Sequence, residues 1–215
     1  MRTDEGYIKF SCAHEAAPPP RHPWLHELCR IRDDLHEWRL IGVLPDGIGY
    51  GNLSARLDNT LRFIVTASGT GFEYPIAERH FCEVLSFDIE RNAVACRGPL
   101  PASSESMSHG AVYAARPDAR AVIHIHDRLL FRMLLGEGAP RTPADAAFGT
   151  PEIARAIGRL APALPPVAIL VMAGHQDGLL AFAPDPRAAR DALWTAYVPP
   201  GANNRPRNSP AIQKV

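Results

Sequence analysis

Long apolar runs and an excess of charge of one sign are both missing from this sequence of 215 residues. No apolar run approaches the roughly 20 residues that span a bilayer, and the opening segment, MRTDEGYIKF, lacks the apolar core of a signal peptide. The 23 basic and 23 acidic side chains cancel, which leaves no basic field for nucleic acid or an anionic membrane. We therefore expect a cytoplasmic protein without nucleic-acid or membrane partners.

Paired cysteine motifs are absent as well. The four cysteines form no CxxC pair, and a chain of this length buries a sizeable core without disulfide staples. Reduced, mostly buried thiols are therefore expected at Cys12, Cys29, Cys82 and Cys96. The nine histidines are more informative, because three of them occupy unusual local settings.

The pattern of elements predicts an α/β fold in one domain. Residues 1–22, which end in AAPPPRH, are expected to form an extended or mobile arm. Residues 23–198 are expected to form the domain itself, and the Pro/Asn-rich residues 199–215 a disordered tail. Apolar spacing predicts helices at 23–40, 104–116, 128–135, 150–160 and 186–198. Alternating or continuous apolar segments predict strands at 51–57, 61–66, 83–90, 93–98, 119–127, 167–174 and 178–184, with a glycine-rich loop at 44–51. Because short turns join several strands, we expect a mixed or antiparallel sheet flanked by helices.

His124 and His126 form the first chemical signal. On a strand, residues two apart point to the same face, so both imidazoles can reach one divalent cation. Two core or sheet-surface histidines are the alternative. His175 follows the buried segment VAILVMAG, in a turn whose side chains can project into a cleft. Three imidazoles leave an open position for substrate, as catalytic metal sites do, although a turn histidine bonded to the backbone also fits His175.

Glu105 is the candidate acid–base, at the start of the predicted helix at 104–116. A carboxylate there is also a routine helix-start residue. Ser103 or Ser104 can cap this helix. His109 lies four residues after Glu105 on the same helix face, and we interpret it as structural, bonded to Glu105 or packed nearby.

Three small polar clusters are candidate anion sites. Glycines let backbone N–H groups approach an anion, and hydroxyl groups add donors. Turns use the same residue types, so each cluster is informative only if the three converge in space. The clusters are Gly51-Asn52 with Ser54, Ser68-Gly69, and Ser103-Ser104.

The order of five short motifs resembles the class II aldolase/adducin family, which includes fuculose-phosphate aldolase. The motifs are GNLSAR, TASGTG, SSE, HIH and MAGHQDG, and the resemblance spans roughly His26 to Tyr197. It implies an α/β/α sandwich around a mainly antiparallel sheet, a catalytic domain over 23–198, a small-molecule substrate and a homotetramer.

The resemblance also assigns roles by position. His124, His126 and His175 match the family's metal ligands, and Glu105 matches its acid–base carboxylate. A substrate phosphate is expected at Gly51, Asn52, Ser68, Gly69, Ser103 and Ser104. Zn²⁺ suits three imidazoles, while Mn²⁺, Fe²⁺ and Co²⁺ stay open.

The sequence departs from the family beside two of the histidines. Asp127 follows the second histidine where many relatives have a small hydroxyl residue, and Gly174-His175-Gln176-Asp177 replaces Asn-His-Gly. Both changes border the site and leave the metal ligands in place. Asp127 either orients a ligand or caps the following helix, and we favour the cap.

Together these features predict a metal-dependent aldolase. The expected reaction cleaves or forms a C–C bond in a small hydroxy-carbonyl, sugar-phosphate-like compound through a metal-stabilised enediolate, with Glu105 transferring a proton. An epimerase, dehydratase or decarboxylase would use the same chemistry. A non-catalytic, adducin-like module is the alternative of a different class.

Overall fold

The computed structural model describes residues 10–197, and within them eight strands build one sheet. The strands are β1 (Ser11–Ala16), β4 (Asn52–Arg56), β5 (Phe63–Thr66), β6 (Phe81–Asp88), β7 (Ala93–Gly98), β8 (Ala121–His126), β9 (Ala168–Val171) and β10 (Gly178–Ala183). Their order is β1-β7-β6-β5-β4-β8-β10-β9. Only the edge pair β1 and β7 is parallel; the other neighbours are antiparallel. The predicted mixed, mainly antiparallel sheet is confirmed.

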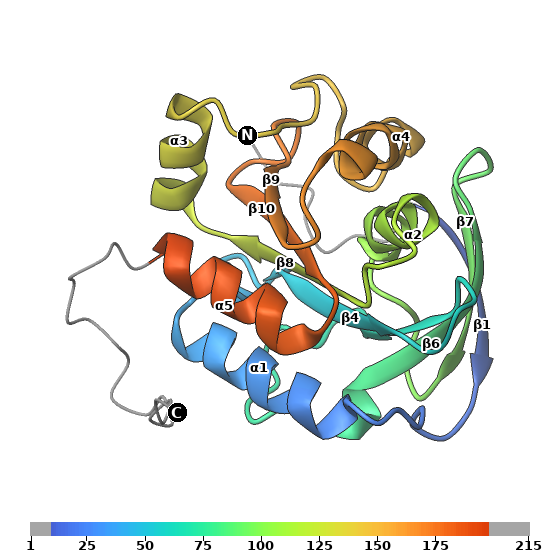
Figure 1. Ribbon diagram of the computed structural model, residues 1–215. Helices are drawn as coiled ribbons and strands as arrows, with labels where there is room; N and C mark the ends of the chain where they lie inside the picture. Colours follow the sequence, from blue (N-terminus) through green and yellow to red (C-terminus); the bar gives the residue numbers. More distant parts are fainter. Residues whose placement is uncertain (1–9, 198–215) are drawn as a thin grey trace.

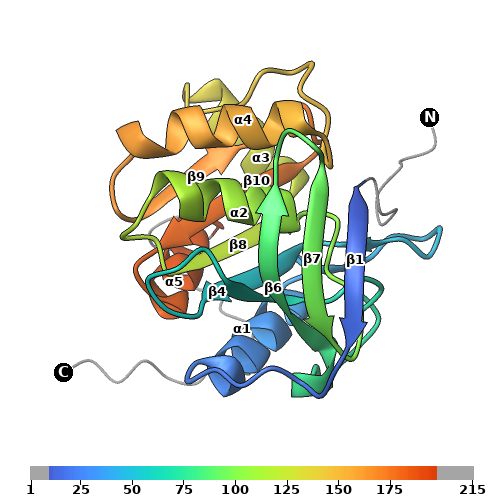
Figure 2. The same cartoon turned by 90° about the vertical axis from the view of Figure 1, so that its right-hand side faces the viewer.

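Helices cover both faces of this sheet, as the expected α/β/α sandwich requires. The helices are α1 (Leu25–Glu37), α2 (Ser106–Ala115), α3 (Arg128–Gly136), α4 (Pro151–Leu160) and α5 (Pro186–Tyr197). In Figure 1, α1 and α5 lie together on one face, and α2 and α4 lie on the other. Figure 2, turned by 90°, shows the strong twist between β6, β7 and β1 and the rest of the sheet.

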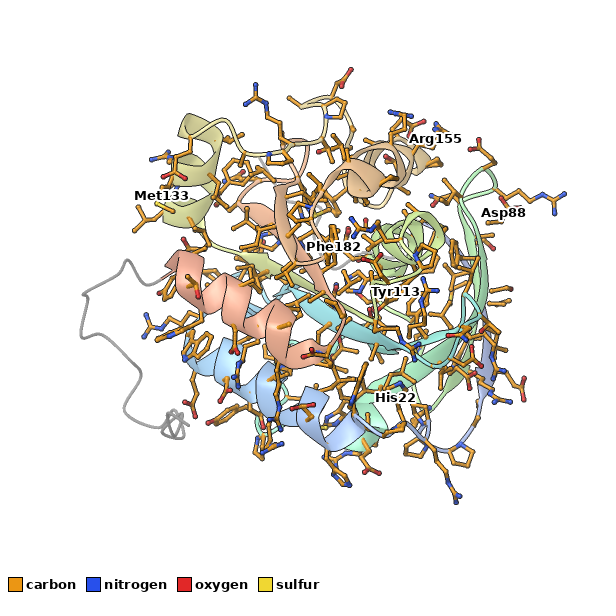
Figure 3. The ribbon with its side chains drawn as sticks, in the orientation of Figure 1. His22, Asp88, Tyr113, Met133, Arg155 and Phe182 are labelled. Atoms are coloured by element: carbon orange, nitrogen blue, oxygen red, sulfur yellow. The ribbon has the colours of Figure 1, made fainter. Side chains whose placement is uncertain are left out.

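Each face has its own apolar core. One core contains Phe63, Met107, Ile153 and Phe182, between the sheet and α2 with α4. The other contains Leu28, Leu35, Leu53 and Leu193, beneath α1 and α5. Figure 3 shows Phe182 and Tyr113 inside the molecule and Met133 pointing outward from α3. Across residues 10–197, no helix combines the length and the apolar character needed to cross a membrane.

The structure differs from the sequence prediction mainly at element ends and in short elements. Within the segment expected as an extended or mobile arm, residues 11–16 form the edge strand β1; the tail expected at 199–215 lies outside the described residues. The glycine-rich loop contains a two-stranded ribbon, β2 (Gly42–Val43) and β3 (Gly49–Tyr50), and two short 3₁₀ turns occur at Glu78–His80 and Ala161–Ala163. Helix α1 stops at Glu37 rather than residue 40, because Arg39 adopts a left-handed φ of 60°.

A buried polar network ties α2 to β4. Ser54 Oγ lies 2.7 Å from His109 Nδ1 and 2.7 Å from the Tyr113 hydroxyl oxygen, and all three residues are buried. The structural interpretation of His109 therefore holds, with Ser54 as its partner in place of Glu105. Burial lowers the pKa of His109 from 6.5 to about 3, so this ring is neutral in the folded protein at neutral pH.

The first prediction concerns stability in acid. Between about pH 6.5 and pH 3 the unfolded chain binds a proton at His109 that the folded chain does not bind. For each unit by which the pH falls in this range, His109 therefore lowers the free energy of unfolding by about 1.4 kcal/mol. Urea unfolding from pH 7.5 to pH 4 should therefore show the stability difference between the wild type and His109→Asn shifting in favour of the variant. The same substitution at exposed His26 controls for the loss of one histidine. A difference that stays constant with pH contradicts the prediction.

Candidate metal centre

Two of the three candidate ligands come from one strand in the middle of the sheet. β8 lies between β4 and β10, where His124 pairs with Asn52 on one side and Leu180 on the other. His124 and His126 share a face, while Ile123 and Ile125 point into the opposite core. The β-branched neighbours favour the strand, and the period of two brings both rings to the same place.

The third candidate, His175, comes from the turn between β9 and β10. Its N–H donates to Met172 O at 2.8 Å, and its carbonyl accepts from Gly178 N at 2.9 Å, so the turn is tightly closed. A Cβ on Gly178 would lie 3.1 Å from His175 Cγ and 3.2 Å from His124 Cε1. Because Gly178 has no side chain, the rings of His124 and His175 can both lie next to its Cα.

The three rings converge. Their centroids lie 4.8 Å apart for His124 and His126, 4.9 Å for His124 and His175, and 4.6 Å for His126 and His175. One nitrogen from each ring can be chosen so that all three lie within 4.8 Å of one another. His124 and His175 are buried, and His126 is partly buried.

The donor set fits a divalent cation. His124 Nδ1 lies 3.0 Å from the Leu179 carbonyl oxygen, and an acceptor there requires the proton to be on Nδ1, which leaves the lone pair on Nε2. That Nε2 lies 3.0 Å from His126 Nε2. The two nitrogens are close enough for a hydrogen bond between the rings or for both to bind one cation.

Burial keeps these imidazoles uncharged. Desolvation lowers the pKa of His124 well below 6.5, and the neighbouring His126 and His175 lower it further. Desolvation lowers the pKa of His126 in the same way, with an added effect of His175. Neutral imidazole is the form that binds metal, so the pocket holds these two rings in the ligand form.

Glu105 faces the same cavity with one carboxylate oxygen uncommitted. The residue is 3% exposed; Ser108 Oγ donates to Oε2 at 2.7 Å, and the buried Oε1 has no hydrogen-bond partner. Glu105 occupies the N-cap position of α2, but its carboxylate accepts no bond from the helix N–H groups. The routine helix-start role is therefore not what its carboxylate performs.

The serines beside Glu105 do not cap α2, contrary to the sequence prediction, because Glu105 itself holds the N-cap position. Ser103 Oγ instead accepts from Glu105 N at 3.4 Å and from Asn52 Nδ2 at 2.9 Å. Ser103 thus links the side chain of Asn52 on β4 to the backbone at the start of α2.

One cavity of about 190 Å³ brings the sequence candidates together. Its walls contain the three histidines, Glu105 and all six residues expected to bind phosphate, namely Gly51, Asn52, Ser68, Gly69, Ser103 and Ser104. Ser54 does not line the cavity and belongs to the buried network with His109. The three polar clusters therefore converge in space, apart from Ser54.

Sequence reasoning did not identify two aromatic residues of this cavity. Tyr50 lies with its ring centroid 5.5 Å from that of His126, and Phe148 stacks on His175 at 4.4 Å. No pattern in the neighbouring sequence marks either residue, because each lies far from its histidine in the chain and contacts it only in the folded structure. Asp127 caps α3, as expected, by accepting from Leu130 N at 2.7 Å.

Comparison with known proteins places this architecture among established folds. The family model described as "Class II Aldolase and Adducin N-terminal domain" matches residues 46–197. A structure described as YgbL, a putative aldolase/epimerase/decarboxylase from Klebsiella pneumoniae, is 20% identical with a TM-score of 0.59, over 79% of this chain and 82% of that one. A structure of L-fuculose 1-phosphate aldolase is 24% identical with a TM-score of 0.59, over 83% of this chain and 85% of that one. Both likenesses establish the fold.

A curated relative shares part of the sequence. The protein named 3-oxo-tetronate 4-phosphate decarboxylase, from Haemophilus influenzae, is 35% identical over 82 residues. The match covers 38% of this chain and 35% of the relative's length. It is thus a local similarity, well short of two thirds of either chain.

The second prediction concerns the backbone beside His175. A Cβ on Gly174 would lie 1.9 Å from Ala146 O, so Gly174→Ala must push the β9–β10 turn away from residue 146. We expect the free energy of unfolding to fall by about 2 kcal/mol. Affinity for Co²⁺, measured by absorption titration, should fall at least tenfold. The control is Gly136→Ala, where nothing lies within 4 Å of the added Cβ. Equal Co²⁺ affinity in the two variants contradicts the prediction.

Proposed function

We propose a metal-dependent carbon–carbon lyase activity for this chain, which belongs to the class II aldolase and adducin family. The proposed reaction is aldol cleavage or formation in a small hydroxy-carbonyl compound that carries a phosphate. The convergence of His124, His126 and His175 in one cavity with Glu105, whose Oε1 has no hydrogen-bond partner, is the observation that carries the proposal.

The metal-binding role rests on the donor set. His124, His126 and His175 would hold the ion, and three neutral imidazoles favour Zn²⁺ over harder cations. A divalent cation bound there supplies Lewis-acid polarisation of substrate oxygens. The protein contributes the fixed direction of each ring, which the bond between His124 and the Leu179 carbonyl illustrates.

Glu105 is the proposed acid–base. Its Oε2 is held by Ser108, while Oε1 is buried and without a partner, so a substrate carbon beside Oε1 can give up a proton to it or receive one. The adjacent hydroxyl groups of Ser68, Ser103 and Ser104, the amide of Asn52 and the backbone at Gly51 and Gly69 offer donors for a phosphate group. One cavity thereby combines a carboxylate for proton transfer with donors for an anion.

Decarboxylation is the second candidate reaction. The local similarity to a protein named as a decarboxylase of a 3-oxo acid phosphate favours it. Loss of CO₂ from a 3-oxo acid leaves a carbanion next to a carbonyl, as aldol cleavage does, so the same residues serve both reactions. A non-catalytic module has no need of a cavity equipped with three imidazoles and a buried carboxylate. The homotetramer expected from the family and the cytoplasmic location expected from the composition stay predictions.

The experiment that tests the function is a screen of purified, Zn²⁺-loaded protein against small phosphorylated ketoses and phosphorylated 3-oxo acids. We expect metal-dependent release of an aldehyde from the first class or of CO₂ from the second, lost on treatment with a chelator and restored by metal. Turnover that survives complete metal removal contradicts the proposal.

The third prediction concerns Glu105. Glu105→Gln keeps the size of the side chain but removes its capacity to accept a proton, so kcat should fall at least 100-fold while bound metal, measured by atomic absorption, stays stoichiometric. Glu137→Gln, at an exposed position after α3, is the matched control and should keep full activity. Full activity in Glu105→Gln with metal bound removes Glu105 from the mechanism.

The fourth prediction concerns the serines. Ser68→Ala and Ser103→Ala each remove one of the hydroxyl donors proposed to bind the phosphate, so KM for the phosphorylated substrate should rise about tenfold. KM for its unphosphorylated analogue should change less than twofold. Ser86→Ala, at an exposed position of β6, should change neither constant. An equal loss for both substrates refutes the phosphate assignment.

A further inference from the structure

The cavity contains no lysine or arginine among its lining residues in the described part of the chain. A dianionic substrate group held there would meet hydroxyl, amide, imidazole and backbone donors, and no lysine or arginine side chain of the described residues. The segment Ala67–Gly71 forms one wall, and directly behind it lies a cation from the opposite side of the sheet. That cation is the guanidinium of Arg32, on α1.

Arg32 is fixed against this wall. Its side chain is among the largest fully buried ones, with the residue 1% exposed. Nη2 donates to Thr70 O at 2.9 Å and to Gly71 O at 3.0 Å. The same helix also binds the chain five residues after Gly71, because Asp33 Oδ1 accepts a hydrogen bond from Ile76 N at 2.9 Å.

The charge of Arg32 lacks a paired anion. Among the described residues no carboxylate forms an ion pair with it within 4.0 Å, and its buried Nη1 has no hydrogen-bond partner. Burial lowers the pKa of its guanidinium, and the carboxylates of Asp33 and Glu73 oppose that effect from further away. A buried, unpaired cation is costly to maintain, and its field favours an anion in the adjacent cavity.

The two carbonyl bonds also orient the wall. In a trans peptide the N–H points opposite to the C=O, so the carbonyls of Thr70 and Gly71, both directed at Arg32, turn the next two N–H groups away from it. These are the N–H groups of Gly71 and Phe72, which donate to no backbone acceptor within the described residues, and Gly71 lines the cavity. Such uncommitted N–H groups are the donors that anion-binding loops use.

We propose that Arg32 is a positioning residue that gives this cavity its preference for a phosphorylated substrate. It acts from behind the wall, through its charge and through the two carbonyls that it holds, without touching the substrate. The identity of the ligand rests on the proposed function, whereas the binding of phosphate itself can be measured without turnover.

The test uses inorganic phosphate as the probe and Zn²⁺-loaded full-length protein, with affinity measured by isothermal titration calorimetry. Arg32→Gln removes the charge and keeps a hydrogen-bond donor, and Arg32→Lys keeps the charge together with N–H donors for the two carbonyls. Arg30→Gln removes an exposed charge from the same helix. We expect phosphate affinity to fall about tenfold in Arg32→Gln, and to stay within about threefold of the wild type in Arg32→Lys and Arg30→Gln.

The outcomes separate charge from structure. Equal losses in Arg32→Gln and Arg32→Lys assign Arg32 a structural role only and overturn the proposal. Unchanged affinity in Arg32→Gln also overturns it, as does the absence of phosphate binding to the wild type at millimolar phosphate. If Arg32→Gln does not fold, Arg32→Met replaces it, because methionine is of similar length and carries no charge. The phosphate affinity of Arg32→Lys must still stay close to that of the wild type. A protein without lyase activity that shows the expected phosphate pattern overturns the proposed function and leaves this inference standing.

Discussion

The hydrogen bond between His124 Nδ1 and the Leu179 carbonyl is the interaction on which the centre depends. It joins a ring on β8 to the backbone of β10, two strands whose register already places His126 opposite Gly178. Because the carbonyl can only accept, the bond determines which nitrogen of His124 is left for a cation. The antiparallel pairing of these strands therefore sets both the position and the chemical form of the ligand, and the pairing of β10 with β9 closes the turn that carries His175.

The fold was predictable from the sequence because its signals are local. The period of two at His124 and His126, the helical spacing around Leu28 and Leu35, and the turn at Asn92, whose φ of 48° asparagine tolerates, all act over a few residues. The strand β1 was missed as a strand because it gains its bonds from β7, some 80 residues later. An edge strand with mostly exposed side chains carries little apolar pattern to detect.

The candidate site was predictable in its ligands but less so in its surroundings. His124, His126, His175 and Glu105 were named from residue type, spacing and motif order, and the structure places them around one cavity; whether they bind a metal stays a prediction. Ser54 as the partner of His109, Phe148 on His175 and Arg32 behind the wall were not foreseen. Each joins residues 27 or more positions apart, and such contacts are fixed by how the layers pack and not by any pattern along the chain.

The lack of a side chain at Gly178 has a consequence for redesign of this protein. The rings of His124 and His175 lie where a side chain at this position would have to fit. A substitution at Gly178 would therefore displace one or both imidazoles. Libraries intended to change the range of accepted compounds should therefore leave the β9–β10 hairpin untouched. Variation belongs in the ribbon around residues 47–50 and at residue 148, which line the same cavity from segments that carry none of the three imidazoles.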